Sequence, residues 1–258
     1  MKRFGLLGYP LIHSGSPHYF TEKFLKEGIV NASYELFPVA DLSRFRDWLN
    51  EQDEISGLNV TIPYKTSILP LLDELDPLAN DIGAVNTVTI SRKTGNLWLK
   101  GFNTDVYGFL NSLPKPLNHS HALVLGTGGA SRAVTYVLKH LGIRFLFVSR
   151  QPNPPLTIGY REITRKIIRE YTLIINTTPL GMVPDFQFLP AIPYEWIDDH
   201  HFLYDLIYNP PETAFLAKGK RKHAHIQNGI SMLYLQAEQA FNIFFPTTSA
   251  PSSGDPHL

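Results

Sequence analysis

The fold of this chain is decided by a stretch near its middle, Ala122-Leu123-Val124-Leu125-Gly126-Thr127-Gly128-Gly129-Ala130-Ser131-Arg132-Ala133. A short apolar run breaks into glycines and then continues with helical spacing, which predicts a buried strand, a tight turn and a helix. Gly126 permits the turn, and Gly128 and Gly129 let the backbone approach a pyrophosphate at the helix N-terminus. The third glycine of the standard dinucleotide fingerprint would fall at Ser131. The stretch therefore favours a nucleotide-binding loop, with an ordinary glycine-rich turn as the alternative.

The residues after this loop predict a βαβ unit that prefers NADP. The helical pattern ends at Gly142, and residues 144–149 supply a second buried strand. An NAD enzyme would place Asp or Glu at the end of that strand, roughly 20 residues after the glycines, to bind the ribose hydroxyls. Here Ser149 and Arg150 stand instead, and a guanidinium suits a 2′-phosphate. The alternative is an arginine that is merely solvated at the end of a strand.

Length and composition allow two domains. With 258 residues, 43% of them apolar, the chain is long enough for two modest cores. Because the glycines lie near the middle, we expect a substrate-binding domain at 1–105 and an NADP-binding domain at 106–229. Residues 246–258 are rich in Pro, Ser and Thr with little to bury, which predicts a disordered tail.

Charge and residue usage narrow the range of partners. The 23 basic residues balance the 23 acidic ones, so no global field favours nucleic acid or an anionic membrane, and a small molecule is the expected partner. The chain has no cysteine, which excludes a disulfide framework and thiol chemistry. It also lacks a run of about 18 apolar residues and a cationic leader. We therefore expect a cytoplasmic protein.

The first domain also alternates strands and helices. Apolar periodicity predicts strands at 3–8, 32–37 and 58–62, and helices around 20–25, 42–49 and 67–72. This alternation implies a parallel sheet. Residues 86–90 and 97–101, joined by a polar turn with Gly95, predict a hairpin that closes the domain, and 105–113 predict the helix that crosses to the second domain.

Polar residues interrupt these elements near their ends. Asn59 and Thr61 alternate on one face of an apolar strand, and Lys65 follows just beyond its carboxyl end, where open α/β sheets bind ligands. Asn86 and Asp105 lie at two further element boundaries. For any one of them a turn or cap role is the alternative, but together they indicate a binding site.

These residues carry a family resemblance: the chain resembles shikimate dehydrogenases over nearly its whole length apart from the tail. Eight blocks occur in the family's order, and they are Gly8-Tyr9-Pro10 through His13-Ser14-Gly15-Ser16, Asn59-Val60-Thr61-Ile62-Pro63-Tyr64-Lys65, Gly83-Ala84-Val85-Asn86-Thr87, Asn103-Thr104-Asp105, Gly126-Thr127-Gly128-Gly129-Ala130, Asn176-Thr177-Thr178-Pro179-Leu180-Gly181-Met182, Tyr204-Asp205-Leu206-Ile207-Tyr208, and Asn228-Gly229 through Met232-Leu233 to Gln236-Ala237.

The resemblance implies a fold of two α/β domains with a cleft between them, an N-terminal substrate domain and a Rossmann-like NADP-binding domain. The helix at 230–245 would pack back on the first domain. The implied activity is the reversible NADPH-dependent reduction of 3-dehydroshikimate to shikimate, a step of chorismate and aromatic amino acid biosynthesis. A quinate-using relative, a non-catalytic ligand-binding relative and a tetrahydrofolate-handling dehydrogenase are the alternatives, and a monomer or a homodimer remains open.

The resemblance also implies a role for each matching residue. Lys65 and Asp105 would form the catalytic pair. Ser14, Ser16 and Tyr208 would bind the substrate carboxylate, and Asn59, Thr61, Asn86 and Gln236 would hold the ring hydroxyls. The cofactor would be bound by Gly126, Thr127, Gly128, Gly129, Ala130, Ser149, Arg150, Leu206 and Gly229.

Three departures from the family pattern stand out. Many members have His-Asn where this chain has Phe20-Thr21, and the arginine is usually framed as Asn-Arg-Thr rather than Ser149-Arg150-Gln151. The segment 151–160 also looks short.

We expect no metal site, because His223 and His225, predicted on one face of a strand, lack a nearby acidic partner. His200 and His201 are predicted to lie in a surface turn.

Overall fold

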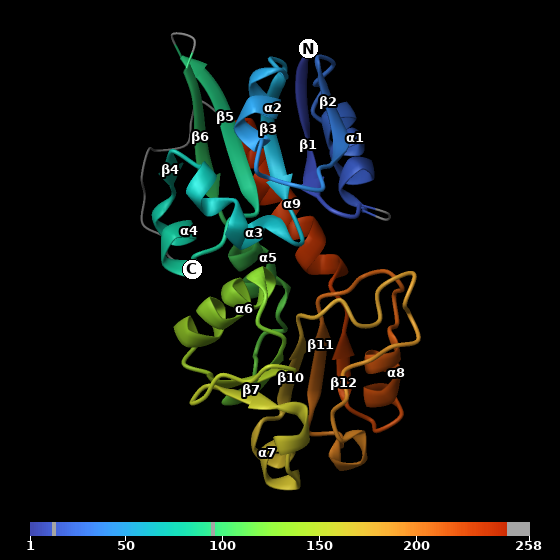
Figure 1. Cartoon of the computed structure of the whole chain (residues 1–258). Coiled ribbons are helices and arrows are strands. Elements are labelled where there is room, and N and C mark those ends of the chain that lie inside the picture. The colour runs from blue at the N-terminus through green and yellow to red at the C-terminus, as the bar shows by residue number, and fades with distance from the viewer. Residues whose placement is uncertain (12–13, 94–95, 247–258) are drawn as a thin grey trace. The chain divides into compact units, whose positions relative to one another are not determined.

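The computed structural model describes residues 1–11, 14–93 and 96–246. The chain divides into two compact units, the first formed by Met1–Gly108 with the chain from Tyr234 onward, and the second by Phe109–Leu233. Two helices, α5 (Asp105–Ser112) and α9 (Ile230–Phe244), continue from one unit into the other. Figure 1 shows the two sheets around which the units are built. The predicted tail lies outside the described residues from residue 247 onward.

The sheet of the first unit is mixed. Among the described residues it has six strands in the order β2-β1-β3-β5-β6-β4. Their bounds are β1 (Lys2–Gly8), β2 (Ala32–Pro38), β3 (Ile55–Val60), β4 (Glu74–Leu75), β5 (Thr87–Lys93) and β6 (Asn96–Phe102). β1 pairs in parallel with β2 and β3, whereas β5 is antiparallel to both β3 and β6. The hairpin is confirmed, and because it enters the same sheet, the expectation of a parallel sheet holds for β1, β2 and β3 and for the short β4–β6 pair but not for β5.

Helices cover both faces of this sheet. They are α1 (Ser16–Lys26), α2 (Phe45–Asn50), α3 (Tyr64–Ser67) and α4 (Pro77–Ile82), together with α9 and the 3₁₀ turn η1 (Leu69–Leu71). One core cluster packs α1 and α9 against Phe4 and Tyr34, and the other packs α2, α3 and α4 against the opposite face. A Cβ at Gly57 would lie 2.5 Å from the Phe244 ring, so this glycine lets α9 lie directly on the sheet.

The second unit has the predicted βαβ organisation. Its sheet, in the described part of the chain, has six strands in the order β12-β11-β10-β7-β8-β9. The strands are β7 (His121–Leu125), β8 (Arg144–Ser149), β9 (Thr157–Gly159), β10 (Leu173–Asn176), β11 (Phe202–Asp205) and β12 (His225–Gln227). Every pair is parallel. The strand order reverses between β7 and β10, and open α/β sheets bind ligands at the carboxyl ends of strands at such a switch point.

The helices of the second unit are α6 (Gly129–His140), α7 (Arg165–Glu170) and α8 (Ala214–Lys220), with the 3₁₀ turns η2 (Tyr160–Glu162) and η3 (Tyr194–Trp196). α7 and α8 contribute Ile168, Phe215 and Leu216 to a core cluster with Leu123 and Leu203 of the central strands. Apolar runs such as Leu123-Val124-Leu125 are buried at 0% exposure because helices cover both faces of a parallel sheet.

Several element boundaries differ from the prediction. β3 ends at Val60 rather than at Ile62, and the helix expected over 67–72 is a short α3 followed by η1. Pro70 lies within η1 and has no N–H to continue an α-helix. In α1, Phe20 and Phe24 are buried as expected, whereas Leu25 is 76% exposed.

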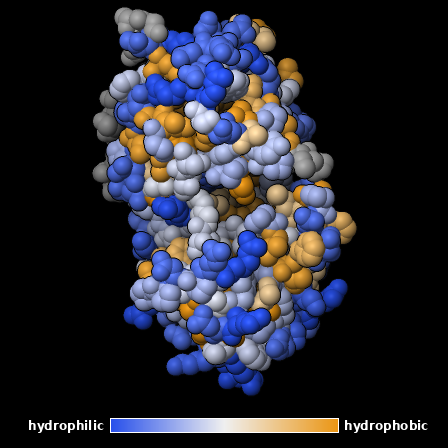
Figure 2. Space-filling view, in the orientation of Figure 1, coloured by the Kyte–Doolittle hydropathy of each residue, from blue (hydrophilic) through white to orange (hydrophobic). Residues whose placement is uncertain are grey.

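The described helices contain none that combines the length and the apolar character required of a membrane span. Figure 2 shows hydrophilic residues over most of the face that it displays, with hydrophobic residues in smaller groups between them. Exposed hydrophobic side chains in single positions are normal for globular proteins.

Candidate active site

A buried ion pair marks the polar end of the first sheet. Lys65 Nζ donates to Asp105 Oδ2 at 2.6 Å, and the two side chains are only 15% and 5% exposed. Lys65 lies in α3, just after the carboxyl end of β3, and Asp105 is the first residue of α5. Asn103 sets this start, because its Oδ1 accepts from Val106 N at 3.3 Å while its Nδ2 donates to Ala84 O at 2.9 Å. Local capping therefore places the carboxylate beside the lysine.

Asn86 connects this ion pair to the rest of the site. Its Nδ2 donates to Asp105 Oδ1 and Thr104 Oγ1, each at 2.9 Å, and its Oδ1 accepts from Thr104 N at 2.7 Å. Gln236 Oε1 of α9 lies 3.4 Å from Asn86 Nδ2 and 3.3 Å from Thr104 Oγ1. Four residues from three parts of the sequence thus meet at one point of the first unit.

Asn59 forms the next part of this polar group. It is 6% exposed near the end of β3. Its Nδ2 donates to Thr87 Oγ1 at 3.1 Å, and its Oδ1 accepts from the Tyr34 hydroxyl at 2.8 Å. Tyr34, Thr87 and Thr104 are not among the predicted site residues. A signal was present for Thr87, which directly follows Asn86, and for Thr104, which directly precedes Asp105.

The two predicted carboxylate-binding serines lie together at the start of α1. Ser16 N donates to Ser14 Oγ at 3.2 Å, and Ser16 is 7% exposed. Thr61 follows β3 and its backbone N–H donates to Leu7 O at 2.9 Å, which keeps it at the same end of the sheet. Tyr208, the third predicted carboxylate ligand, belongs to the second unit.

In the second unit the glycine loop follows β7 as predicted. Gly126 has φ of 102°, and a Cβ there would lie 2.9 Å from Thr177 Oγ1 and from Thr178 Cγ2. Gly128 caps α6, and a Cβ added to it would meet nothing within 4 Å. The departure at Ser131 is accommodated because this buried hydroxyl donates to Gly128 O at 2.7 Å. The turn and the twelve-residue helix that follows have the geometry of a phosphate-binding loop.

Arg150 directly follows β8, the strand next to β7 in the sheet, and is exposed. Ser149 Oγ accepts from Gln151 N at 3.2 Å, so the serine orders the turn that carries the arginine. Leu206 and Gly229 are neighbours, since a Cβ at Gly229 would lie 2.0 Å from Leu206 O and therefore excludes any side chain there. All of the predicted cofactor ligands thus lie in the second unit.

A buried carboxylate that the sequence did not predict to be buried lies at the end of β11. Asp205 accepts from Asn176 Nδ2 at 3.0 Å, from Ile207 N at 3.1 Å and from the Thr213 hydroxyl at 2.6 Å. Asn176 also accepts from Thr178 N and its hydroxyl, at 3.1 and 2.7 Å, so this group orders the loop beside Gly126. Burial raises the pKa of Asp205 to about 6, against the opposing effect of these hydrogen bonds.

We expect this carboxylate to make unfolding pH-dependent. Because the folded-state pKa of Asp205 lies above the unfolded value, the folded state holds a proton that the unfolded state has lost, and stability falls as pH rises towards about 6. Between pH 5 and pH 7 the wild type should lose about 1 kcal/mol more than Asp205→Asn, which removes the titration. Urea unfolding at both pH values measures this, and parallel pH profiles of the two proteins would contradict it.

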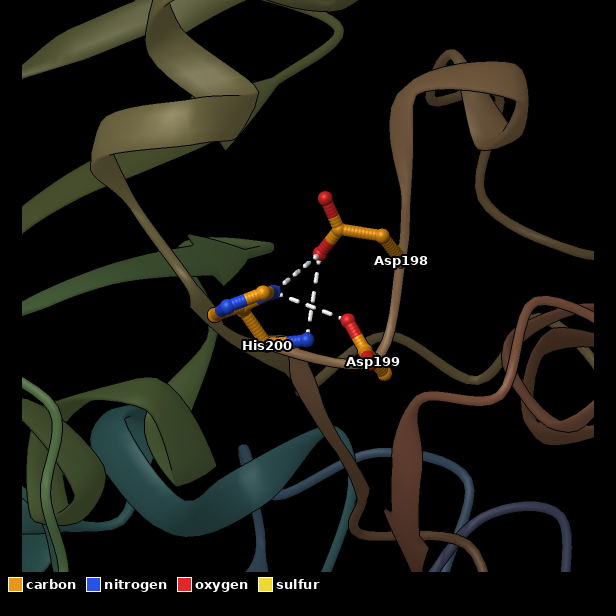
Figure 3. A group of neighbouring side chains, drawn as sticks. All are labelled: Asp198, Asp199 and His200. Atoms are coloured by element: carbon orange, nitrogen blue, oxygen red, sulfur yellow. Dashed lines mark hydrogen bonds and ion pairs between the residues drawn. The ribbon is translucent and has the colours of Figure 1, made fainter.

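Asp198, Asp199 and His200 form an exposed cluster whose potential ligand atoms lie within 4.8 Å of one another (Figure 3). Asp198 Oδ1 accepts from His200 N at 3.1 Å and lies 2.8 Å from His201 Nδ1, so the cluster orders the turn before β11. We assign it a structural role. His201 is 1% exposed, with Nε2 3.0 Å from Ile168 O, so the prediction of a surface turn is wrong for this residue.

His223 also differs from the prediction. It has φ of 62° and precedes β12, which begins at His225. The two histidines therefore do not alternate along one strand, because the chain is still turning at His223.

Comparison with known proteins gives consistent matches. A family model described as the shikimate dehydrogenase substrate binding domain matches residues 6–88. The shikimate dehydrogenase (NADP(+)) of Methanosphaera stadtmanae is 35% identical over 96% of this chain and 92% of its own length. That of Carboxydothermus hydrogenoformans is 36% identical over 93% and 90%. A crystal structure of shikimate 5-dehydrogenase from Thermus thermophilus with NADP(H) and shikimate has a TM-score of 0.81 and 34% identity, covering 95% of this chain and 94% of that one.

Proposed function

This chain belongs to the shikimate dehydrogenase family, and on that premise we propose that it catalyses the reversible NADPH-dependent reduction of 3-dehydroshikimate to shikimate. The observation that carries the proposal is the buried Lys65–Asp105 pair at 2.6 Å, joined through Asn86 to Gln236. A lysine and a carboxylate held this way at the carboxyl end of a sheet supply an acid and a group that orients it.

Reduction of the ring ketone requires a proton donor at its carbonyl oxygen. Bound NADPH supplies the hydride for the ring ketone. The Lys65 ammonium donates a proton to the oxygen that becomes the hydroxyl and stabilises the negative charge that develops there. Asp105 Oδ2 accepts from Lys65, and its Oδ1 accepts from Asn86 Nδ2. A hydrogen bond to each oxygen therefore holds the carboxylate in one orientation beside the lysine. In shikimate oxidation the same lysine takes the proton back.

Polar side chains of the first unit would hold the substrate. Asn59, Thr61, Asn86 and Gln236 offer amide and hydroxyl groups for the ring hydroxyls. Ser14 and Ser16, together with Tyr208 of the second unit, offer hydroxyl donors for the carboxylate. Neutral donors can bind a carboxylate with about 1–3 kcal/mol of affinity each where they would otherwise be left unpaired.

The second unit fits NADP. Gly126, Thr127, Gly128, Gly129 and Ala130 would hold the pyrophosphate, because the first turn of α6 presents backbone N–H groups and the positive end of a helix dipole. Ser149 and Arg150 would bind the 2′-phosphate from the end of β8. Leu206 and Gly229 would line the nicotinamide position, where the missing side chain at Gly229 keeps the surface close to the backbone.

Parallel assays test the proposed function. Purified protein with NADPH should reduce 3-dehydroshikimate at least tenfold more efficiently, in kcat/KM, than 3-dehydroquinate, followed by the loss of NADPH absorbance. A preference for 3-dehydroquinate would identify a quinate-using relative. Failure to oxidise NADPH with either substrate would identify a non-catalytic relative.

The proposal also covers the oligomeric state and the cellular location of the enzyme. The proposed site residues all come from one chain, which is compatible with a monomer or a homodimer. The lack of cysteine in the sequence is compatible with a cytoplasmic protein that acts on free small molecules.

A further inference from the structure

Tyr34 of β2 lies in the first unit with its hydroxyl among the proposed substrate-binding residues. The residue is 8% exposed, and its ring stacks on Phe20 with centroids 4.2 Å apart and planes 3° from parallel. Its hydroxyl donates to Asn59 Oδ1 at 2.8 Å. Burial raises the pKa of Tyr34, so the hydroxyl remains a donor across the physiological pH range.

The Asn86 backbone carbonyl decides which way the Asn59 amide faces, and the Tyr34 hydroxyl completes that orientation by donating to Oδ1. Asn59 Oδ1 accepts from Tyr34, while its Nδ2 donates to Thr87 Oγ1 at 3.1 Å and to Asn86 O at 3.4 Å. If the amide rotated by half a turn, Oδ1 would face the carbonyl of Asn86, which has no proton to donate, and the Tyr34 proton would face an NH₂ group. The Asn86 carbonyl therefore selects one orientation, and Tyr34 and Thr87 hold it from opposite sides, by donating to Oδ1 and by accepting from Nδ2.

Further hydrogen bonds connect Asn59 to the Lys65–Asp105 ion pair, and in each of them the residue nearer to Asn59 is the donor. The Thr87 hydroxyl donates to Asn86 Oδ1 at 3.2 Å, and Asn86 Nδ2 donates to Asp105 Oδ1 at 2.9 Å. Four successive hydrogen bonds thus lead from the Tyr34 hydroxyl through Asn59, Thr87 and Asn86 to Asp105. Each of these residues is 8% exposed or less. Because buried polar groups are costly to leave unpaired, breaking one link disturbs its neighbours.

We propose that Tyr34 and Thr87 are positioning residues that hold Asn59 in the amide orientation that recognises the substrate. This inference rests on the proposed function of the site. Neither residue needs to touch the substrate, since each acts through Asn59.

The test is steady-state kinetics on Tyr34→Phe, which removes one oxygen and keeps the stacked ring. We expect the KM for shikimate to rise about tenfold, the effect of one lost buried hydrogen bond, while kcat changes less than threefold and NADPH affinity stays unchanged. Asn59→Ala should raise KM by itself and should abolish most of the further effect of Tyr34→Phe, because the two act in series.

Tyr194→Phe is the matched control. It also removes a hydroxyl of a half-buried tyrosine, one that donates to Pro190 O at 2.8 Å in the second unit, and it should leave the KM for shikimate unchanged. If Tyr34→Phe does not fold, Thr87→Val tests the same orientation from the other side of Asn59. It should raise KM about tenfold, with Thr87→Ser restoring it.

The outcomes separate this inference from the proposed function. A wild type inactive on shikimate overturns the proposed function. An active wild type whose folded Tyr34→Phe variant, or Thr87→Val variant, keeps the wild-type KM overturns only the positioning role. Equal KM increases in Tyr34→Phe and Tyr194→Phe overturn it as well, because both would then reflect general destabilisation.

Discussion

Lys65→Ala is expected to lower kcat by about 10²–10⁴-fold and to leave NADPH affinity unchanged. The ammonium is the proposed proton donor, and it is held 2.6 Å from Asp105 Oδ2 in the first unit. The proposed NADPH ligands all belong to the second unit. Steady-state kinetics with shikimate and NADP, combined with NADPH fluorescence titration, measures the two quantities separately.

The double variant tests whether the pair acts as a unit. Asp105→Asn removes the charge that orients the lysine, and adding it to Lys65→Ala should cost less than the product of the two single effects. Lys100→Ala is a suitable control, because Lys100 Nζ also forms an ion pair at 2.6 Å, with Glu74 of the same unit. A near-normal kcat in Lys65→Ala, or losses that simply multiply, would reduce Lys65 to a binding or surface residue.

Arg150→Ala is expected to weaken NADPH binding by roughly 10- to 150-fold, which corresponds to about 1.5–3 kcal/mol for a charge-assisted hydrogen bond. NADH affinity should be nearly unchanged, because NADH lacks the 2′-phosphate that the guanidinium would contact. The selectivity for NADPH over NADH should therefore fall by the same factor. Fluorescence titration of both cofactors with wild type and variant gives the ratio directly.

Arg144→Ala provides the matched control for this measurement. Arg144 is also exposed and lies at the first residue of β8, whereas Arg150 directly follows the last residue of the strand. Removing Arg144 changes the net charge of the unit equally but should leave both cofactors unaffected. An equal loss of NADPH and NADH affinity in Arg150→Ala would show that Arg150 does not bind the 2′-phosphate.

Local patterns in the sequence were sufficient for much of the fold. The apolar run, the glycines and the helical spacing between Ala122 and Leu141 predicted β7, the turn at Gly126 and α6, and β8 follows in parallel as expected. The hairpin of β5 and β6 was equally clear. In these segments the residues that decide the structure are close in sequence, because strand burial, turn conformation and helix capping depend on near neighbours.

The connections between the polar residues depend on tertiary packing. Tyr34 and Asn59 are 25 residues apart, and Asn86 and Gln236 are 150 apart, so no local pattern could predict their hydrogen bonds. In the sequence, Tyr34 is one more aromatic residue of a predicted strand. Only the order of the strands in the sheet brings β2 near β3. The burial of His201 and Asp205 is likewise a product of packing, since Ile168 and Asn176, which bond to them, come from other elements. Local chemistry in the chain was enough to predict many of the elements and the residue types at their ends, because these depend on near neighbours. The folded units decided which side chains are buried together and in what direction they donate, because these depend on contacts between distant segments.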